Sequence, residues 1–353
     1  MKVGLMHYTE DYPKLVEHTA RACYQSYNKV TDSSEKFIKG IMAKGHISVA
    51  SVGNIVFGVA GFSGLQEYAG TLTDLMVMKE INNYIRWTLP DAKKNPDTKV
   101  GIVVSMNMLT LLDIKNNIGN YDQSTNLWES IVRLVNRTPD LKWFFDSNTE
   151  LKPKANQYIG KAEPELERPT LLTEDYTALK AKGLSDYELD IHATVTLNLK
   201  VDRATGLQIW RHADMAGGTE LSQRYVNRSD AAYRNLENFE KGSYPSGVSE
   251  EFHDMYDTLV GEVYEELDNS VKRYTEIRDD LIKTGVRQSR AKEVARAILP
   301  NAMTTKIINC RPLRQWKHFL KLRDTNHAQI EVRKDAQAIK RLFDEVGIPY
   351  GEQ

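Results

Sequence analysis

The longest regular pattern in the chain lies between Ser249 and Gly285 and predicts one long amphipathic helix. Ser249 suits the N-cap, Glu250 and Glu251 fall in the first turn, and Gly285 suits the C-terminal end. Apolar residues recur at steps of three and four, which places them on one helical face. They are Phe252, Met255, Leu259, Val263, Leu267, Val271, Tyr274, Ile277 and Leu281. So long a helix must pack in a bundle or at a subunit interface.

Shorter patterns mix helices with strands on both sides of this helix. Helices are predicted at 14–29, 34–43, 72–87, 109–115, 127–134, 204–210, 289–299, 313–322 and 328–346. Strands are predicted at 54–59, 100–104, 194–200 and 304–309, and residues 148–168 are rich in Pro, Lys and Glu and predict a loop. The sequence therefore predicts an α+β fold, a mixed helix and sheet core with long helices, and the character of the chain changes to a helix-and-strand region at about 64–185.

The charge balance excludes a general attraction to nucleic acid. The 353 residues carry 47 Lys and Arg against 48 Asp and Glu, so an anionic partner must be met by a local cluster of cations. No run is apolar and long enough for a signal peptide or a membrane span, so we expect a cytoplasmic protein without a membrane partner. Cys23 and Cys310 stand far apart without ligand spacing, which indicates neither a disulfide framework nor a metal site.

Residues 211–225 gather the most polar chemistry in the chain. Arg211, His212, Glu220, Ser222 and Arg224 surround a Gly-Gly pair that predicts a turn. Paired arginines beside an acid and a hydroxyl suit a phosphate and a planar polar ring. The plain alternative is a surface loop with an incidental ion pair.

This segment resembles the signature of the flavin-dependent thymidylate synthases, which runs Arg-His-Arg, Ser, Asn-Glu, Ser, Arg-Tyr. Arg211-His212 opens it, and Glu220, Ser222 and Arg224-Tyr225 close it with the family's spacing. Further similar stretches are 20–24, 45–48, Arg203, Gln208, Trp210, 295–300, 313–314, 318–323 and 327–333. The resemblance covers residues 14–62 and 190–345.

The chain also departs from the family pattern. Ala213 replaces the third signature residue, normally Arg, and the segment from Met215 to Thr219 is altered and one residue longer. Ser51-Val52 stands where the family usually has Glu-His, and Pro312 where it has Asn. Residues 64–187 have no counterpart in compact members. The expected division is therefore a family-like core at 1–63 and 188–353, with an insertion at 64–187 that packs beside or covers the site.

The resemblance implies a flavin-dependent methyltransferase of nucleotide biosynthesis that converts dUMP to dTMP. Methylene-tetrahydrofolate would supply the carbon, and FAD reduced by NADPH the hydride, in a homotetramer whose sites lie between subunits. By position, the substrate-binding residues are Gln208, Arg211, Glu220, Ser222, Arg224, Arg296 and Arg323, of which Arg323 and Ser222 are the catalytic candidates. The cofactor-binding residues are His46, Ser48, Arg211, His212, Arg314 and His318.

Two alternatives stay open from the sequence. The same scaffold could act on another pyrimidine deoxynucleotide such as dCMP, or add a hydroxymethyl group, because the altered signature can reshape the pocket. Alternatively, the chain is a flavin-free structural homologue. Each arginine taken alone is an ordinary surface residue, so the argument rests on their joint match.

Overall fold

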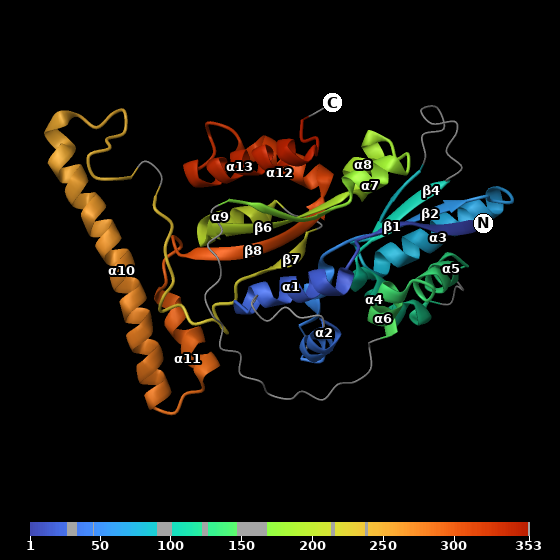
Figure 1. The fold of residues 1–353 in the computed structure, drawn as a ribbon, viewed down its shortest axis with the longest axis horizontal. Coiled ribbons are helices and arrows are strands. Elements are labelled where there is room, and N and C mark those ends of the chain that lie inside the picture. The colour runs from blue at the N-terminus through green and yellow to red at the C-terminus, as the bar shows by residue number, and fades with distance from the viewer. Residues whose placement is uncertain are drawn as a thin grey trace.

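The computed structural model describes residues 1–26, 34–44, 46–89, 101–121, 126–146, 168–212, 216–236 and 239–351. Its described strands form two four-stranded sheets, ordered β1-β2-β4-β3 and β5-β6-β8-β7, and every neighbouring pair is antiparallel. The strands are β1 Lys2–Tyr8, β2 Ile55–Ala60, β3 Arg86–Thr88, β4 Ile102–Met106, β5 Thr170–Glu174, β6 Thr194–Asp202, β7 Gly217–Glu220 and β8 Thr304–Pro312. Helices cover both sheets, which confirms the predicted α+β class (Figure 1).

The second sheet is covered on both faces. Helices α12 (Leu313–Arg323) and α13 (Ile330–Val346) lie above it, and α1 (Tyr12–Tyr24) lies below it (Figure 1). The central pair β6 and β8 is in register from Thr194 opposite Pro312 to Asp202 opposite Thr304. Ile307 packs in the core under α12 and α13, whereas its neighbour Ile308 packs in the core with α1. Since side chains alternate along a strand, each face of β8 serves a different core.

The first sheet combines β1 and β2 with strands from the predicted insertion. Its helices include α3 Leu65–Ile81, α4 Met108–Asn117, α5 Asn126–Val135 and α6 Pro139–Asp146. Strand β4 pairs with β2, and β5 pairs with β6 of the other sheet. Residues 64–187 therefore contribute strands to both sheets.

Buried polar groups join the two sheets at the end of helix α8 (Asp186–His192). The His192 ring lies 2.8 Å from the hydroxyls of both Thr88 and Ser105. Arg86 donates from Nη1 to the Ile191 carbonyl at 2.9 Å and from Nη2 to Oδ1 of Asn54 at 2.8 Å. These contacts connect β3 and β4 of the first sheet to the helix that leads into β6.

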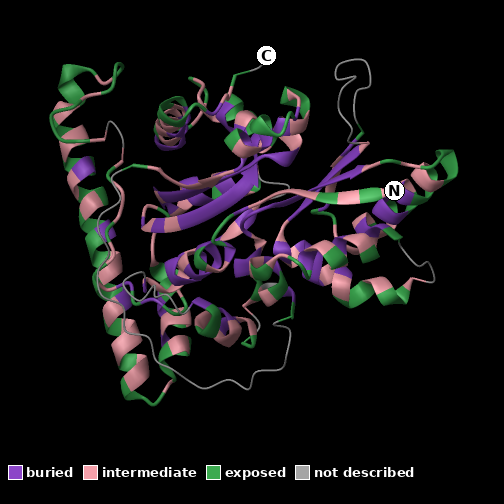
Figure 2. Ribbon diagram, turned by 45° about the vertical axis from the view of Figure 1, so that its right-hand side comes forward, coloured by how far each residue is buried: buried purple, intermediate pink, exposed green. Residues whose placement is uncertain are grey.

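The predicted long helix is α10 (His253–Lys283), which stands along one side of the molecule (Figure 1). A 3-10 turn, Glu250–Phe252, precedes it, and the Ser249 side chain makes no cap hydrogen bond. Val260, Leu267 and Tyr274 are buried, but much of the helix surface is open (Figure 2). The exposed apolar residues of its first half are Phe252, Met255, Leu259 and Val263. Within this chain, only part of the apolar stripe is covered.

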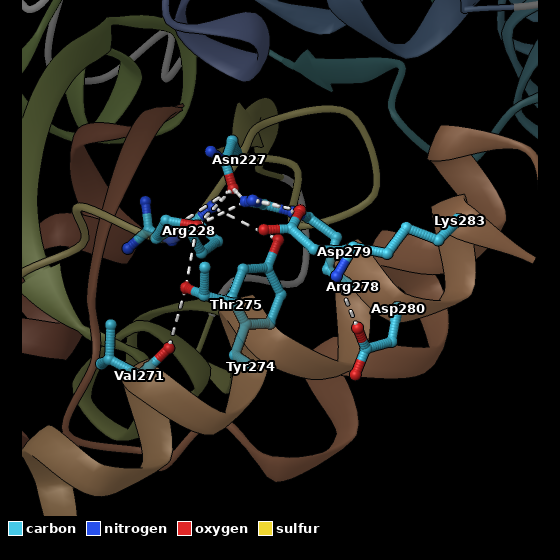
Figure 3. Close-up of polar contacts among 10 residues, drawn as sticks. Asn227, Arg228, Val271, Tyr274, Thr275, Arg278, Asp279, Asp280 and Lys283 are labelled. Atoms are coloured by element: carbon cyan, nitrogen blue, oxygen red, sulfur yellow. Dashed lines mark hydrogen bonds and ion pairs between the residues drawn. The ribbon is translucent and has the colours of Figure 1, made fainter.

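The C-terminal half of α10 is held by the segment after the signature (Figure 3). Arg278 donates through Nη1 to Oδ1 of Asn227 and to Oγ of Ser229. The backbone N–H of Arg228 donates to the Tyr274 hydroxyl at 3.3 Å, and its Nη2 donates to the Thr304 carbonyl at 2.5 Å. Helix α10 and the segment that follows the signature therefore pack as one unit.

Several predicted bounds are wrong. The first helix ends at Tyr24, because Gln25 takes a left-handed conformation with φ 48°. The helix predicted at 72–87 is α3, which ends at Ile81; residues 82–85 turn the chain, and Trp87 lies in β3. Most of the predicted loop 148–168 lies outside the described residues. No described helix is long and apolar enough to cross a membrane.

The cationic pocket and the Arg224 cluster

The Gly-Gly pair of the signature is part of strand β7, so its prediction as a turn is wrong. A Cβ on Gly217 would lie 1.9 Å from the Ser51 carbonyl oxygen, and one on Gly218 would lie 1.9 Å from the Ile308 carbonyl oxygen. Gly218 also has φ +138°, which favours glycine, and its N–H donates to Oγ of Ser51 at 3.0 Å. The glycines are needed because two backbones approach closely here.

Four of the predicted residues meet where α9 (Arg203–Arg211) ends against α12. Arg323 donates through Nη2 to Nε2 of His212. The rings of His212 and His318 are 6.3 Å apart, and Arg211 is close enough to lower the pKa of both His212 and Arg323. Burial is the largest cause that lowers the pKa of His212, followed by Arg323. His212 is therefore a neutral ring that accepts a hydrogen bond at Nε2.

A pocket of about 760 Å³ opens beside this group. Its lining residues are Lys79, Asn83, Tyr84, Arg86, Asp190, Ile191, His212, Pro312, Arg314, Gln315 and His318. His212, Arg314 and His318 were predicted from the sequence. Lys79, Tyr84 and Arg86, from the 64–187 segment, were missed because the helix pattern was extended through Trp87. An Asn82-Asn83 pair is a turn signal that could have ended that helix earlier.

The pocket carries more positive than negative charge. Its one carboxylate, Asp190, is paired with Lys317 at 2.8 Å. In the described part of the chain, Lys79, Arg86 and Arg314 form no ion pair. Burial lowers the pKa of Arg86 to about 10 and lowers that of Lys79, on which Arg86 also acts. Uncompensated cations in a concave site favour an anionic ligand.

Buried nitrogens without partners lie in the same part of the core. Nε of Arg323 and Nη1 of Arg311 are buried and have no hydrogen-bond partner among the described residues. Burial lowers the pKa of Arg311 to about 9, and its guanidinium lies 4.2 Å from the centroid of the Trp316 ring. Such groups normally find a partner. Neither arginine lines the pocket, but the lining cations Lys79, Arg86 and Arg314 fit a group with phosphate oxygens, as a flavin dinucleotide has.

A second group, the Arg224 cluster, lies around the end of the signature. It comprises Arg224, Tyr225, His46, Tyr24 and Glu293. Arg224 forms an ion pair with Glu293 of α11 (Gln288–Ala295) and lies 5.3 Å from the centroid of the Tyr225 ring. The His46 ring packs edge-on against Tyr225 at 5.9 Å and Tyr24 at 6.2 Å. His46 thus packs against Tyr225, which is next to the predicted substrate residue Arg224, and it does not line the cationic pocket.

The remaining predicted residues lie around these two groups. Glu220 accepts from Arg203 and from the Thr305 hydroxyl, both at 3.0 Å. Ser222 donates its N–H to the Cys23 carbonyl at 3.0 Å, and its Oγ accepts from the Arg224 N–H at 3.3 Å. Gln208 donates to Gln329 at 2.7 Å.

Two of the predicted residues are exposed, and their side chains form no hydrogen bond or ion pair with a described residue. Arg296 lies in the 3-10 turn Arg296–Ile298 and has no ion pair to a described residue, and Ser48 lies near the start of the turn Ile47–Ser51. Neither residue lines the cationic pocket. Within this chain, the predicted residues therefore lie around two groups, the cationic pocket and the Arg224 cluster, and Arg296 and Ser48 lie apart from the pocket.

Residues 189–348 match the family model described as thymidylate synthase complementing protein. The flavin-dependent thymidylate synthase of Mycobacterium avium (strain 104) is 28% identical over 162 residues, or 43% of this chain and 59% of the relative. The one from Mycobacteroides abscessus is 27% identical over 233 residues, which are 60% of this chain and 85% of the relative. The one from Corynebacterium efficiens is 28% identical over 168 residues, which are 46% of this chain and 62% of the relative.

The chain spans 59% of the length of the Mycobacterium avium relative and 62% of that of the Corynebacterium efficiens relative. The family match begins in α8 and ends after α13, so it includes both sides of the His212–Arg323 contact and the cationic side of the pocket. Residues 189–348 of the chain are therefore similar to the thymidylate synthase complementing protein family.

Proposed function

We propose that the protein is a flavin-dependent thymidylate synthase that converts dUMP to dTMP with FAD, NADPH and methylene-tetrahydrofolate. The observation that carries the proposal is the pocket beside His212, Arg314 and His318, whose cations lack carboxylate partners among the described residues. A site of this charge suits a phosphate-bearing cofactor. The family match covers these three residues.

His212, Arg314 and His318 would hold FAD, with Arg211 beside them. When bound, FAD supplies the hydride chemistry that protein side chains lack. Arg323, in contact with His212, would stabilise negative charge that develops on a uracil carbonyl. Arg224 and Arg296 would bind the phosphate of dUMP, with Gln208, Glu220 and Ser222 around the rest of the nucleotide.

The state of the two cysteines agrees with a route that needs no cysteine nucleophile. Burial raises the pKa of Cys310 and of Cys23, and it is the largest cause for both thiols. A thiol is nucleophilic as the thiolate, so both groups are poor nucleophiles near neutral pH. A flavin-dependent activation of uracil is compatible with these two thiols, of which Cys310 is buried and Cys23 is partly buried.

We further propose a homotetramer whose sites are completed by neighbouring subunits. The Arg224 cluster and the cationic pocket are separate groups in one chain, and Arg296 is exposed. The uncovered apolar residues in the first half of α10 supply a surface that association would bury. A cytoplasmic location stays a prediction from the sequence.

A spectrum and a product assay test the proposal together. The purified protein should bind FAD and show its visible absorbance, and it should convert dUMP to dTMP when methylene-tetrahydrofolate and NADPH are added. Reactions with dUMP and dCMP run side by side distinguish the substrate, and mass analysis distinguishes a methyl from a hydroxymethyl product. A protein that stays colourless with added FAD and forms no product would reject the proposal and favour a flavin-free homologue.

A further inference from the structure

The cationic pocket has a wall that the family match does not include. Lys79 lies in the last turn of helix α3, and Tyr84 lies in the connection to β3, whereas the match begins at residue 189. Both residues line the pocket together with Arg314 and His318. The segment that was expected to pack beside or cover the site therefore contributes residues to the lining of this pocket.

Lys79 retains capacity for a ligand after its structural contacts are counted. Its ammonium donates to the carbonyls of Asn83 at 3.0 Å and Ile85 at 3.3 Å, and it lies 5.8 Å from the centroid of the Trp87 ring. An ammonium has three N–H donors, so one donor is left. Among the described residues no carboxylate forms an ion pair with Lys79, although the adjacent Arg86 adds a second positive charge. The contacts at the helix end account for two of the three Lys79 donors. They do not explain why Lys79 and Arg86, two cations without a carboxylate partner among the described residues, line the same pocket.

Tyr84 presents an aromatic ring at the same pocket. The residue is 38% exposed, and its N–H is held by Oδ1 of Asn82 at 2.9 Å. That contact anchors the backbone and leaves the ring available. An amphipathic ring at the edge of a pocket suits stacking on a planar heterocycle.

We infer that the 64–187 segment supplies one wall of the flavin site, where Lys79 binds the pyrophosphate of FAD and Tyr84 packs against one of its rings. This inference rests on the proposed function, because it takes FAD as the occupant. The volume of about 760 Å³ is in the range of cofactor pockets and accommodates part of a dinucleotide. Arg86 contributes charge, but it also joins the sheets and is unsuitable as a test variant.

The test is equilibrium binding of FAD to the full chain, followed by quenching of flavin fluorescence. Lys79→Met should weaken FAD binding on the order of tenfold to a hundredfold, as expected for loss of one charge-assisted hydrogen bond. Its affinity for riboflavin, which has no phosphate, should stay unchanged. Tyr84→Ala should weaken binding severalfold, and Tyr84→Phe, which keeps the ring, should bind like the wild type.

Lys142→Met is the matched control, because Lys142 is exposed on α6 in the same segment and does not line the pocket. If the wild type binds FAD and the Lys79 and Tyr84 variants bind it equally well, the inference is wrong and the proposed function stands. If Lys79→Met weakens binding of NADP⁺ instead of FAD, the assignment of the occupant is wrong. A wild type that binds no FAD rejects the proposed function itself. Should Lys79→Met fail to fold, Lys79→Gln keeps donors for the two carbonyls and provides the same comparison.

Discussion

Gly217 and Ser51 are in such close contact that a Cβ on Gly217 would lie 1.9 Å from the Ser51 carbonyl oxygen. Ser51 stands where the family usually has Glu, and Gly217 lies in the altered part of the signature. Both departures therefore meet in space, where the Gly218 N–H donates to Oγ of Ser51. A small residue at 51 and glycine at 217 let β7 pack directly on the turn Ile47–Ser51.

Gly217→Ala should destabilise the fold. The added methyl would overlap the Ser51 carbonyl, and a backbone atom cannot move aside as a flexible side chain can. We expect a loss of about 1–3 kcal/mol in the free energy of unfolding, typical of overpacking. Gly70→Ala in α3 is the control, since a Cβ there meets nothing within 4 Å and alanine favours a helix. Chemical denaturation measures both, and an equal midpoint for the two variants would contradict the close contact.

Arg323→Ala should reduce turnover of dUMP on the order of a hundredfold or more, the scale for loss of one preorganised donor. Arg323→Lys should restore little, because an ammonium lacks the planar fork of donors. Flavin content should stay near that of the wild type. Arg341→Ala, exposed on α13, is the control. Wild-type turnover in Arg323→Ala together with an inactive Arg296→Ala would show that the ring-activating role was assigned to the wrong arginine.

Arg323→Ala should also change the titration of His212. Because Arg323 is one cause of the lowered pKa of His212, its removal should move that pKa back toward the usual value near 6.5. The ring then gains a proton at a higher pH than in the wild type. NMR of the histidine ring signals measures the shift, and an unchanged His212 titration in Arg323→Ala would contradict the electrostatic coupling between the two side chains.

The free energy of unfolding should decrease as the pH is lowered below about 6.5, because of His192. Burial, and then Arg86, hold the pKa of His192 well below its usual value. In this window the unfolded chain binds a proton at His192 that the folded protein does not, so acid favours unfolding by up to about 1.4 kcal/mol per pH unit. Denaturation at pH 7.5 and 5.5 should show a smaller difference for His192→Gln than for the wild type. His327→Gln, at an exposed site, should leave the difference unchanged.

Leu259→Lys should reduce the size of the oligomer. Leu259 is 46% exposed in the middle of the uncovered part of the α10 stripe, and a lysine there would place a charge in any interface that buries it. Leu65→Lys is the control, because Leu65 is 88% exposed at the start of α3, far from this helix in the fold (Figure 1). Sedimentation velocity distinguishes the states. An unchanged oligomer would place the subunit interface elsewhere.

Much of the fold could be predicted from local patterns. The stripe at steps of three and four gave α10, and the alternating residues of 194–200 gave β6, because the core side of an element repeats with the period of its backbone. The resemblance to the family likewise made Arg211, His212, Arg314 and His318 cofactor-binding candidates and Arg323 a substrate-binding candidate. These features depend on residues close in sequence, or on a motif, and need no knowledge of packing.

The tertiary structure decided the rest. Gly217-Gly218 was interpreted as a turn, but pairing with β8 and contact with Ser51 make it a strand, since both partners are distant in sequence. His46 is a cofactor candidate by its place in the family motif, and its packing against Tyr225 depends on segments that are distant in sequence. Lys79 and Tyr84 belong to no sequence motif. They line the pocket because β3 pairs with β4 and because Arg86 donates a hydrogen bond to α8. The sequence by itself determined which side chains the site could use, and packing of the two sheets determined which of them meet, because proximity between distant segments depends on the whole fold.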